Sequence, residues 1–491
     1  MRAPGRKRKA PARAAPPIVS ARLSGHIALE AGTDGNISAS FEGQSVDLGK
    51  FSASAVRRSQ ELRTGLPLRS FAQQRSNVDK EIELLVRRLA RRGLLEYRLG
   101  RAGEDDIVVI EPQVSGYWPR MAELGNANTI VLSRFAYLRR RGNEMVLESP
   151  RAGALFRICD PKVASTLASL STPQKLGRLR RQDGFPGLDL LALLMDCHFL
   201  FKVDADAGDS LRSAEGDDNL VLWDFHDLLF HTHTTEGRHA NPLGGVYPYA
   251  GMIAPPPAVR PPWPGKTIDL RKLSAASTEP ASPFVTLLRE RHSMREFDDR
   301  NPITLDELSR FLEATSRVHA KWESPIDLGD TSPVVDYAIR PYPAGGSAYE
   351  LELYLAVANC DGLPRGFYHY DADRHALAPI ALRGQELEAL WAGAEFAMDA
   401  PAPPQILITI AARFDRVAWK YSSIAYALIL KDAGVLIQTL YLMATEMGLG
   451  GCAIGSTNID LFSKMTGIEF HVEGPVVQFA LGRGKKPDGS D

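Results

Sequence analysis

The sequence predicts an α+β protein with more than one domain, and three observations support this prediction. The chain has 491 residues, which is more than one hydrophobic core usually organises. The segment APPPAVRPPWPG, residues 254–265, is too rich in proline to form a helix and predicts a stiff linker. Beyond this linker, helical segments alternate with strand-like segments, which is typical of an α+β or α/β domain. We expect that domain to span residues 266–491, with a mixed sheet flanked by helices.

Composition and charge exclude several classes of protein. Hydrophobic residues make up 44% of the chain and charged residues 24%, as in ordinary soluble proteins. The net charge of −1 gives no general attraction to nucleic acid or anionic membranes, and no apolar run predicts a membrane span. The four cysteines are scattered without a C-x-x-C spacing, which argues against a disulfide framework or a structural zinc site and favours a cytoplasmic location.

The N-terminal part of the chain predicts a tail followed by two similar units. Residues 1–17 are basic and rich in proline, with no apolar stretch that would indicate a secretory signal. We expect a disordered tail, and the alternative is an arm that binds a partner. Further on, a helix with one apolar face runs to Gly93, and a strand follows it. The segment LDLLALLMDCHFLFKV repeats this helix-then-strand order, and FAYLRRRGNEMVLES predicts a hairpin that turns at Gly142-Asn143.

These units predict two winged-helix-like modules, at residues 18–120 and 121–205. Winged helices commonly bind nucleic acid, but the arginines between residues 87 and 92 fit equally well on a solvated helix face, so nucleic acid is not the expected partner. Residues 206–265 would then connect the modules to the C-terminal domain. The histidines of this connection lack the H-x-x-x-H spacing with an attendant glutamate, so we expect them to shape the connection rather than bind a metal.

The segment RHSMREF follows an apolar helix and is a candidate anion site. If the segment is extended, Arg291, Ser293 and Arg295 face the same side, because side chains alternate along a strand. Two guanidinium groups and a hydroxyl on one face match what a phosphate needs. The alternative is a charged surface strand that pairs with the charges at residues 298–300.

Glycine-rich segments stand next to two further strands. In PAGGSAYELELYL, Gly345-Gly346 would let the backbone approach a flat ligand, and a plain turn is the alternative. GLGGCAIG follows a long helix rather than a strand, so we reject a Rossmann nucleotide site and expect a helix C-cap followed by a strand that lies against a ligand ring. The last strand ends at Arg483, a further cation for a phosphate. The pair Lys420-Tyr421 stands near the start of what is predicted to be a long buried helix.

In this order, R-x-S-x-R, PAGG, GLGGCAIG and the strand-terminal arginine resemble the nitroreductase-like FMN enzymes. RPYPAGGSAYELELYL, GFYHYDADRHAL and WDFHDLLFHTHTTEGRH resemble, within that family, the SagB/McbC-type (ThcOx-like) azoline dehydrogenases. The resemblance runs from about residue 220 to residue 491, with a looser match through the winged-helix-like region before it. It implies a homodimer with FMN at the subunit interface, a heterocyclised precursor peptide as substrate, and a complex with a cyclodehydratase.

The resemblance also implies a role for each candidate residue. The phosphate of FMN would be held by Arg291, Ser293, Arg295 and Arg483. The isoalloxazine ring would be lined by Pro343, Ala344, Gly345, Gly346, Ser347, Ile454 and Gly455. The family's Lys-Tyr pair is matched by Lys420 and Tyr421, which are therefore the predicted catalytic residues.

Oxidation of a thiazoline or oxazoline to the aromatic azole removes a ring proton and a hydride, and FMN can accept the hydride. Lys420 is a poor base at neutral pH unless burial lowers its pKa, whereas Tyr421 could take the proton as a phenolate that the lysine stabilises. Which of the two holds the proton stays open. The alternative is a lysine whose stem lies along the surface beside a core tyrosine.

Four positions depart from the family pattern, and two other functions compete. The departures are Ala344 for serine, Glu350 for proline, Val435 for histidine and Thr439 for asparagine. A general NAD(P)H-dependent flavin nitroreductase of small molecules would need neither the Lys-Tyr pair nor the long N-terminal extension. A DNA-binding regulator with a flavin-sensing domain is the third reading. In the favoured reading, the N-terminal modules bind the peptide or partner enzymes, because such a module can pair a strand with an extended peptide.

Overall fold

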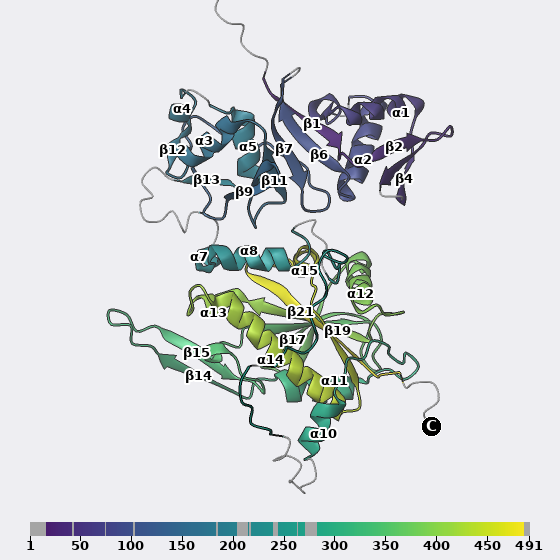
Figure 1. The fold of residues 1–491 in the computed structure, drawn as a ribbon, viewed down its shortest axis with the longest axis vertical. Helices are drawn as coiled ribbons and strands as arrows, with labels where there is room; N and C mark the ends of the chain where they lie inside the picture. The colour runs from purple at the N-terminus through teal and green to yellow at the C-terminus, as the bar shows by residue number, and fades with distance from the viewer. Residues whose placement is uncertain are drawn as a thin grey trace, which may run out of the picture. The chain divides into compact units, whose positions relative to one another are not determined.

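The computed structural model describes residues 16–41, 44–73, 75–101, 104–182, 185–203, 215, 218–238, 244–262, 264–270 and 282–485. The tail predicted at residues 1–17 lies outside these residues, except for its last two. The chain forms two compact units, and Figure 1 shows the elements of each. The first unit comprises residues 1–221 and 237–240, and the second comprises residues 222–236 and 241–491. Helix α8 (Phe225–Thr234) thus belongs to the second unit, although the sequence predicts a connection there.

The first unit contains the same order of elements twice. The first copy consists of β1 (Ile18–Leu23), β2 (Ala28–Ala31), β3 (Asn36–Phe41), β4 (Gln44–Lys50), α1 (Ala53–Ser59), η1 (Gln60–Arg63), β5 (Leu66–Pro67), η2 (Leu68–Ser70), α2 (Asn77–Arg91) and β6 (Leu95–Gly100). The second copy consists of β8 (Thr129–Leu132), β9 (Tyr137–Arg141), β10 (Glu144–Glu148), β11 (Ala154–Ile158), α3 (Pro161–Ser169), β12 (Gln174–Lys175), α4 (Leu176–Leu179), α5 (Leu188–Asp196) and β13 (Leu200–Val203). Helix α7 (Asp218–Leu222) lies at the boundary with the second unit.

The pairing of the strands confirms that the two copies are alike. In each copy the first strand pairs with the two-residue strand and with the closing strand, which gives the orders β5-β1-β6 and β12-β8-β13. The long helix of each copy ends in a left-handed residue, Gly93 with φ 67° and His198 with φ 59°. The amide of the next residue then donates to a helix carbonyl five residues back, at 3.1 and 2.9 Å. The two predicted helix-then-strand units are therefore confirmed, and the winged-helix assignment stays a prediction.

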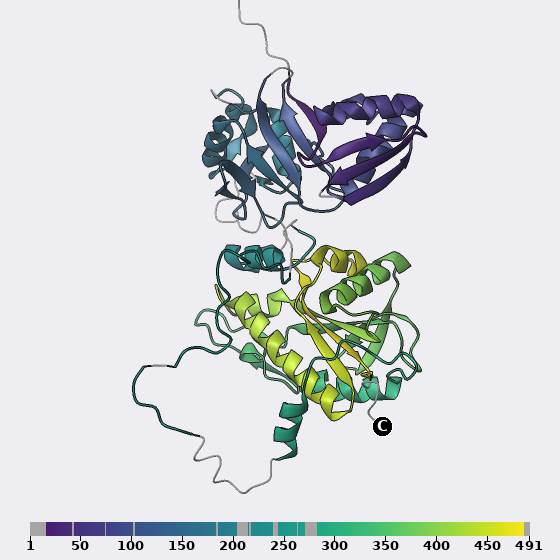
Figure 2. The ribbon, with the colours of Figure 1, turned by 45° about the vertical axis from the view of Figure 1, so that its right-hand side comes forward.

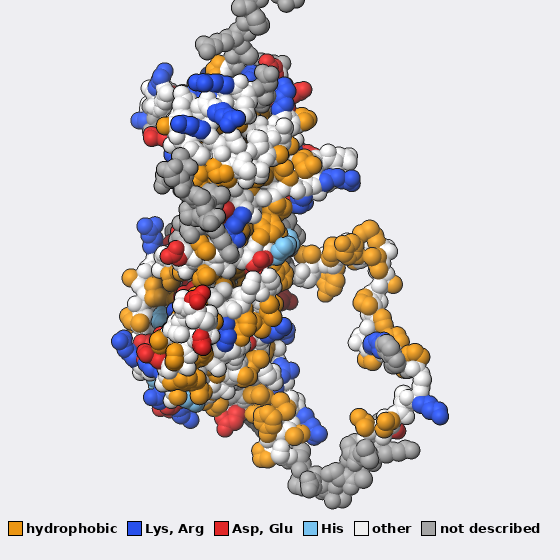
Figure 3. Space-filling model, turned by 90° about the vertical axis from the view of Figure 1, so that its left-hand side faces the viewer, with side chains coloured by type: hydrophobic (Ala, Val, Ile, Leu, Met, Phe, Trp, Pro, Cys, Tyr) orange, Lys and Arg blue, Asp and Glu red, His pale blue; other side chains and the backbone are white. Residues whose placement is uncertain are grey.

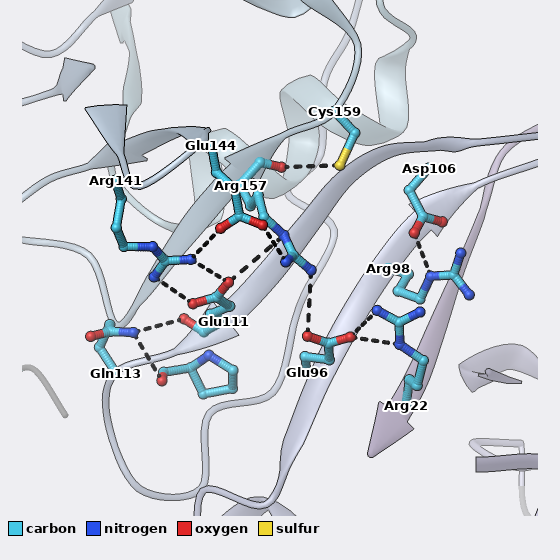
Figure 4. Close-up of polar contacts among 11 residues, drawn as sticks. Arg22, Glu96, Arg98, Asp106, Glu111, Gln113, Arg141, Glu144, Arg157 and Cys159 are labelled. Atoms are coloured by element: carbon cyan, nitrogen blue, oxygen red, sulfur yellow. Dashed lines mark hydrogen bonds and ion pairs between the residues drawn. The ribbon is translucent and has the colours of Figure 1, made fainter. Parts of the chain in front are cut away.

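Strand β7 (Asp106–Pro112) joins the copies, because it pairs with β6 on one side and β11 on the other. Figure 4 shows a row of ion pairs across the resulting seven-stranded sheet. Arg157 lies 2.7 Å from Glu144 and 3.7 Å from Glu96, and Arg141 lies 2.7 Å from Glu111. Since carboxylates occupy these guanidinium groups, this face of the sheet does not present them as a phosphate-binding cluster.

The second unit is built on a six-stranded sheet of order β18-β17-β16-β19-β21-β20. Its strands are β16 (Leu351–Val357), β17 (Gly366–Asp371), β18 (Ala376–Ile380), β19 (Ile406–Arg413), β20 (Gly450–Ile454) and β21 (Glu473–Gly482). Every strand pair in this sheet is antiparallel, whereas the sequence predicts a mixed sheet. The difference arises because β16, β17 and β18 follow one another as hairpins, and antiparallel neighbours are what hairpins produce.

Helices cover both faces of this sheet, as Figures 1 and 2 show. Helices α12 (Gly384–Met398) and α15 (Ile459–Thr466) pack on one face, where Trp391 and Phe462 join a core cluster with Ala480 of β21. Helices α11 (Leu305–Ser316) and α14 (Ala425–Glu446) lie on the other face, where the ring of Tyr441 meets that of Phe479 at 5.0 Å. Successive residues of β21 thus serve opposite layers, as the pleat of a strand requires.

Two helices and one hairpin of the second unit leave apolar side chains exposed. Helix α14 is long and apolar enough to cross a membrane by length and composition, and 39% of its most apolar window is buried within the unit. Helix α10 (Pro283–Glu290) exposes Phe284 and Leu288 to 59% and 43%. Strands β14 (Ala320–Pro325) and β15 (Val334–Ile339) form a separate hairpin, and Figure 3 shows hydrophobic side chains on the face of the unit that carries it.

Candidate functional site

The R-x-S-x-R segment runs along the ends of β20 and β21. The amide of Met294 donates to the carbonyl of Gly451 at 2.8 Å, and Phe297 forms a bridge with Gly484. The side chain of Met294 fills the space above two glycines, because a Cβ at Gly450 or Gly484 would lie 2.6 Å from it. The two glycines therefore let the extended segment lie directly on the sheet.

Tyr441 of α14 organises the polar groups of this segment. Its hydroxyl lies 2.8 Å from Oγ of Ser293 and accepts a hydrogen bond from the amide of Ala453 at 2.7 Å. The guanidinium group of Arg291 lies over its ring, 5.0 Å from the centroid. Among the described residues, no ion pair engages Arg291 or Arg295. Two guanidinium groups without a carboxylate partner, with a hydroxyl between them, fit a phosphate dianion.

Arg483, the fourth predicted phosphate ligand, is engaged elsewhere. Its guanidinium group donates to both carboxylate oxygens of Glu307, at 2.7 and 2.8 Å, and to the carbonyl of Asn301 at 3.2 Å. Glu307 also forms the capping box of α11 with Thr304. Burial acts to raise the pKa of Glu307, but the hydrogen bonds from Arg483 and Thr304 hold that pKa below its ordinary value. The phosphate role of Arg483 stays a prediction, and the structure gives this arginine a role in holding α11.

The PAGG segment forms a strained turn before β16, with the single 3-10 turn η4 at Gly345–Ser347. Backbone φ is positive at Gly346 (59°), Ser347 (56°) and Tyr349 (44°). Two of these three residues carry side chains, for which this conformation is costly. The amide of Gly345 donates to Oδ2 of Asp432 at 2.8 Å, so α14 holds the turn from beneath.

Lys420 and Tyr421 contact this turn. Nζ of Lys420 lies 3.4 Å from the carbonyl oxygen of Gly346 and 5.4 Å from the centroid of the Tyr421 ring. A Cβ at Gly346 would lie 2.4 Å from the Tyr421 hydroxyl and 2.7 Å from Lys420 Nζ. The pair stands in the connection between α13 (Phe414–Ala418) and α14, so the predicted position within a long buried helix is wrong. The amides of both residues bond to the carbonyl of Val417, which ends α13 before α14 begins.

Two cavities are lined by four of the seven predicted ring-lining residues. One, of about 340 Å³, is lined by Lys420, Gly346 and Ser347 together with Trp419 and part of the β14–β15 hairpin. The other, of about 710 Å³, is lined by Ile454 and Gly455 together with part of α12. The single chain thus brings Gly346 and Ser347 to the Lys-Tyr pair, whereas Ile454 and Gly455 line a different cavity. Ser293 lies close to β20 through Tyr441.

Three residues of the site gave little or no signal in the sequence. From α14, Tyr441 contacts Ser293 of the R-x-S-x-R segment and Asp432 contacts Gly345 of the PAGG turn. The apolar pattern of a helix does not show which neighbour each of its polar residues contacts. Glu350 was visible only as a departure from the family pattern. It is fully buried, and burial first, then the neighbouring charge of Asp432, raises its pKa to about 7.

One histidine of the predicted connection, His231, lies in the core of the second unit, whereas His226 and His233 are exposed and His239 lies outside the described residues. His231 of α8 is buried, and its Nδ1 lies 3.0 Å from the hydroxyl of Tyr426. Its ring stacks on that of Trp223, with centroids 5.8 Å apart. Within the described part of the chain, no three His, Cys, Asp or Glu side chains are grouped so as to hold a metal ion.

Comparisons with known proteins match both parts of the chain. Residues 288–483 match the model of the nitroreductase family, and residues 130–240 match the model described as cyanobactin oxidase ThcOx. A putative nitroreductase of Methanocaldococcus jannaschii, MJ1384, is 30% identical over 170 residues, which are 35% of this chain and 77% of that protein. The microcin B17-processing protein McbC of Escherichia coli is 29% identical over 115 residues, which are 22% of this chain and 42% of that protein.

Solved structures also match. A chain of the E. coli microcin synthetase McbBCD complex with truncated pro-MccB17 bound matches with a TM-score of 0.38 and 18% identity, over 55% of this chain and 97% of that one. A putative nitroreductase from Ralstonia eutropha JMP134 matches with a TM-score of 0.31 and 21% identity, over 48% of this chain and 96% of that one. On its identity to MJ1384 over most of that protein, the chain belongs to the nitroreductase family of oxidoreductases, and its predicted resemblance to the SagB/McbC-type branch is confirmed by the ThcOx and McbC matches.

Proposed function

We propose that this protein is an FMN-dependent dehydrogenase that oxidises thiazoline or oxazoline rings in a ribosomally synthesised peptide. The observation that carries the proposal is the contact of Lys420 and Tyr421 with the strained turn at Gly346, at the wall of a 340 Å³ cavity. A base and a phenol held against one turn beside a cavity suit the removal of a proton from a ring. The relatives are described as a microcin B17-processing protein and a cyanobactin oxidase, which supports a ribosomally synthesised peptide as the substrate.

The residues around the R-x-S-x-R segment fit the phosphate of FMN. Arg291 and Arg295 supply charge, Ser293 supplies a hydroxyl, and Tyr441 fixes the position of that hydroxyl. When bound, FMN supplies the acceptor for the hydride that leaves the azoline ring. The ring proton passes to Lys420 or Tyr421, so the ring loses two hydrogens in total and becomes aromatic.

Two copies of the chain would form the functional unit. The anchors of the two sets of site residues, Asp432 and Tyr441, are nine residues apart on α14, or roughly 13 Å along the helix axis. Helix α14 exposes Val435, and α10 exposes Phe284, although both side chains are apolar. A second copy that covers these helices would bury apolar surface and could bring the turn of one chain to the phosphate site of the other. It would also cover Lys420, which is exposed in the single chain.

The decisive experiment combines colour, mass and one variant. We expect the purified protein to be yellow and to convert an azoline-containing peptide with a mass loss of about 2 Da per ring, the mass of two hydrogens. Lys420→Ala should retain the flavin and lose the mass change. A flavin-bound wild type that leaves every azoline peptide unchanged but consumes NAD(P)H with nitroaromatics would instead support the small-molecule nitroreductase.

The first unit would bind the precursor peptide or a cyclodehydratase. Its repeated strands offer edges to which an extended peptide can add, and main-chain hydrogen bonds of this kind supply affinity without requiring one side-chain sequence. A gel-shift experiment with neighbouring promoter DNA separates this role from that of a DNA-binding regulator, for which retention of the DNA is expected.

A further inference from the structure

Glu350 is a fully buried acid at the start of β16, next to the turn that contacts the Lys-Tyr pair. Its exposed fraction is 0%, and no N–H group or hydroxyl of the described residues donates a hydrogen bond to its carboxyl oxygens. An acid in this position costs folding free energy, because burial removes its hydration without supplying donors. A glutamate adds nothing to an apolar core, so its presence at this buried position points to a role in the neighbouring site.

The groups that face Glu350 come from several elements. Asp432 of α14, which is also buried, is its acidic neighbour: the two carboxyl groups lie within hydrogen-bond reach of each other, and each affects the pKa of the other. Arg340, which precedes the turn, lies 3.5 Å from Glu352 and donates to the carbonyl of Leu351. Arg416 of α13 donates to the carbonyl oxygens of residues 336 and 348. Both arginines therefore donate to other acceptors, although Nε of Arg340 has no hydrogen-bond partner among the described residues and both charges act on Glu350.

None of the remaining neighbours in the described part of the chain donates a hydrogen bond to Glu350. The side chain of Tyr342 is buried beside Glu350, and its hydroxyl has no hydrogen-bond partner among the described residues. Lys431 acts on Asp432 through its charge alone. Asp432 accepts a hydrogen bond from the amide of Gly345 at 2.8 Å, so the carboxyl group that faces Glu350 also holds the turn.

We propose that Glu350 is a positioning residue: Glu350 and Asp432 share one proton, and this carboxyl pair fixes the turn at Gly345–Ser347 against Lys420 and Tyr421. With one proton between them, the pair carries a single charge and leaves Asp432 free to accept from Gly345. With no proton, two adjacent buried carboxylates repel each other, and the turn that depends on one of them loosens. The inference rests on the proposed function, because the turn matters only if it lines the flavin site.

The direction of the pH effect follows from the burial of Glu350. Its pKa lies near 7 in the folded chain and near 4.5 in the unfolded chain. The folded state therefore binds more protons than the unfolded state between these pH values, so stability falls as pH rises from 4.5 to 7 and stays low above 7. FMN affinity should fall in turn as pH rises through 7.

The test compares the full-length wild type with Glu350→Gln and with Asp432→Asn. A matched control is Glu473→Gln, since Glu473 is another carboxyl in the same sheet with a raised pKa, bound to Tyr354 at 2.7 Å. FMN affinity is measured by fluorescence between pH 6 and pH 8.5, and the melting midpoint of the flavin-free protein between pH 5 and pH 8. We expect the wild type and Glu473→Gln to lose affinity about tenfold across this range. The FMN affinity of Glu350→Gln and of Asp432→Asn should change by less than about threefold over the same pH range. Each variant keeps one ionisable carboxyl group, so two adjacent charges cannot form.

The outcomes separate this inference from the proposed function. If Glu350→Gln keeps the affinity profile of the wild type, the shared proton is refuted while FMN binding stands. If no protein binds FMN at any pH, the proposed function fails, and the melting midpoints decide the inference alone. In that case the melting midpoints of wild type and Glu350→Gln are compared between pH 5 and pH 8. An equal fall in both proteins refutes the shared proton. A variant that fails to fold is replaced in the comparison by the other member of the pair.

Discussion

The side chain of Lys420 lies 3.4 Å from the backbone carbonyl of Gly346, and the absence of a Cβ at Gly346 makes this approach possible. A methyl group there would meet the Tyr421 hydroxyl at 2.4 Å as well as the lysine amine at 2.7 Å. The contact ties two segments that are 74 residues apart in the sequence. It makes the position of the Lys-Tyr pair sensitive to a single backbone turn.

Gly346→Ala should therefore displace the pair. We expect a loss of at least tenfold in azoline oxidation and a cost of roughly 1–3 kcal/mol in unfolding free energy, because the residue has positive φ and the added atom clashes. FMN absorbance of the purified protein should be retained. Gly384→Ala is the control, since nothing lies within 4 Å of a Cβ at that helix position. Equal activity of Gly346→Ala and wild type would show that the contact has no role in catalysis.

The two kinds of arginine at the predicted phosphate site should behave differently. Within the described residues, Arg291 lies over the Tyr441 ring and has no ion-pair partner, whereas Arg483 donates to both carboxylate oxygens of Glu307. We expect Arg291→Ala to weaken FMN binding at least tenfold with little change in the melting midpoint of the flavin-free protein. Arg483→Ala should cost about 1–3 kcal/mol in unfolding free energy, because it leaves a half-buried carboxylate without its partner. Equal effects of the two variants on stability would contradict this division.

Acid should weaken the Arg483–Glu307 pair. The pKa of Glu307 is lowered in the folded chain, so the folded state binds fewer protons than the unfolded state as pH falls below the ordinary value of 4.5. The stability that the pair contributes is present above that pH and is lost as pH falls through the folded pKa. The melting midpoint of the wild type should fall more steeply than that of Glu307→Gln between pH 5 and pH 3. If the melting midpoints of the two proteins fall equally with pH, the Arg483–Glu307 pair does not contribute to stability.

The periodic elements of the fold were accessible from the sequence, whereas the site geometry was not. One-sided apolar patterns predicted α2 and α5, and the turn residues at 142–143 predicted the β9–β10 hairpin. The direction of strand pairing was missed because it depends on which strands become neighbours, which local patterns do not encode. The boundary near residue 222 was missed for a similar reason: α8 joins the second unit through the buried side chains of Trp223 and His231.

The resemblance supplied the candidate residues, and the structure adds what holds them. Lys420 and Tyr421 could be named from the Lys-Tyr motif, but the break between α13 and α14 has no proline or glycine to announce it. The pairing of Arg483 with Glu307 joins residues 176 positions apart and leaves no local trace. Long-range side-chain contacts of this kind become visible only when the sheet has been assembled.

Tyr441 offers a test of how the phosphate site is held. Its hydroxyl contacts Ser293 at 2.8 Å and accepts from the amide of Ala453 at 2.7 Å. Tyr441→Phe should cost about 1–3 kcal/mol, because the amide and the serine hydroxyl lose a buried partner. It should also lower FMN affinity, as measured by fluorescence titration. Tyr370→Phe is the control: its hydroxyl bonds to His375, at 2.8 Å, and takes no part in the site. An unchanged FMN affinity in Tyr441→Phe would show that Ser293 is held without it.

The boundary of the first unit after Val221 allows its role in substrate recognition to be tested by deletion. Removal of residues 1–221 should leave α8 and its buried contacts within the second unit, whereas removal of residues 1–236 would expose the partners of Trp223 and His231. We expect the 1–221 deletion to reduce kcat/KM at least tenfold for the full-length precursor and to leave kcat/KM unchanged for a short azoline peptide. The reason is that a recognition unit adds affinity only for the part of the substrate it touches. If the wild type and the 1–221 deletion have equal kcat/KM for the full-length precursor, the first unit does not recognise the substrate. Binding of partner enzymes would then be its role.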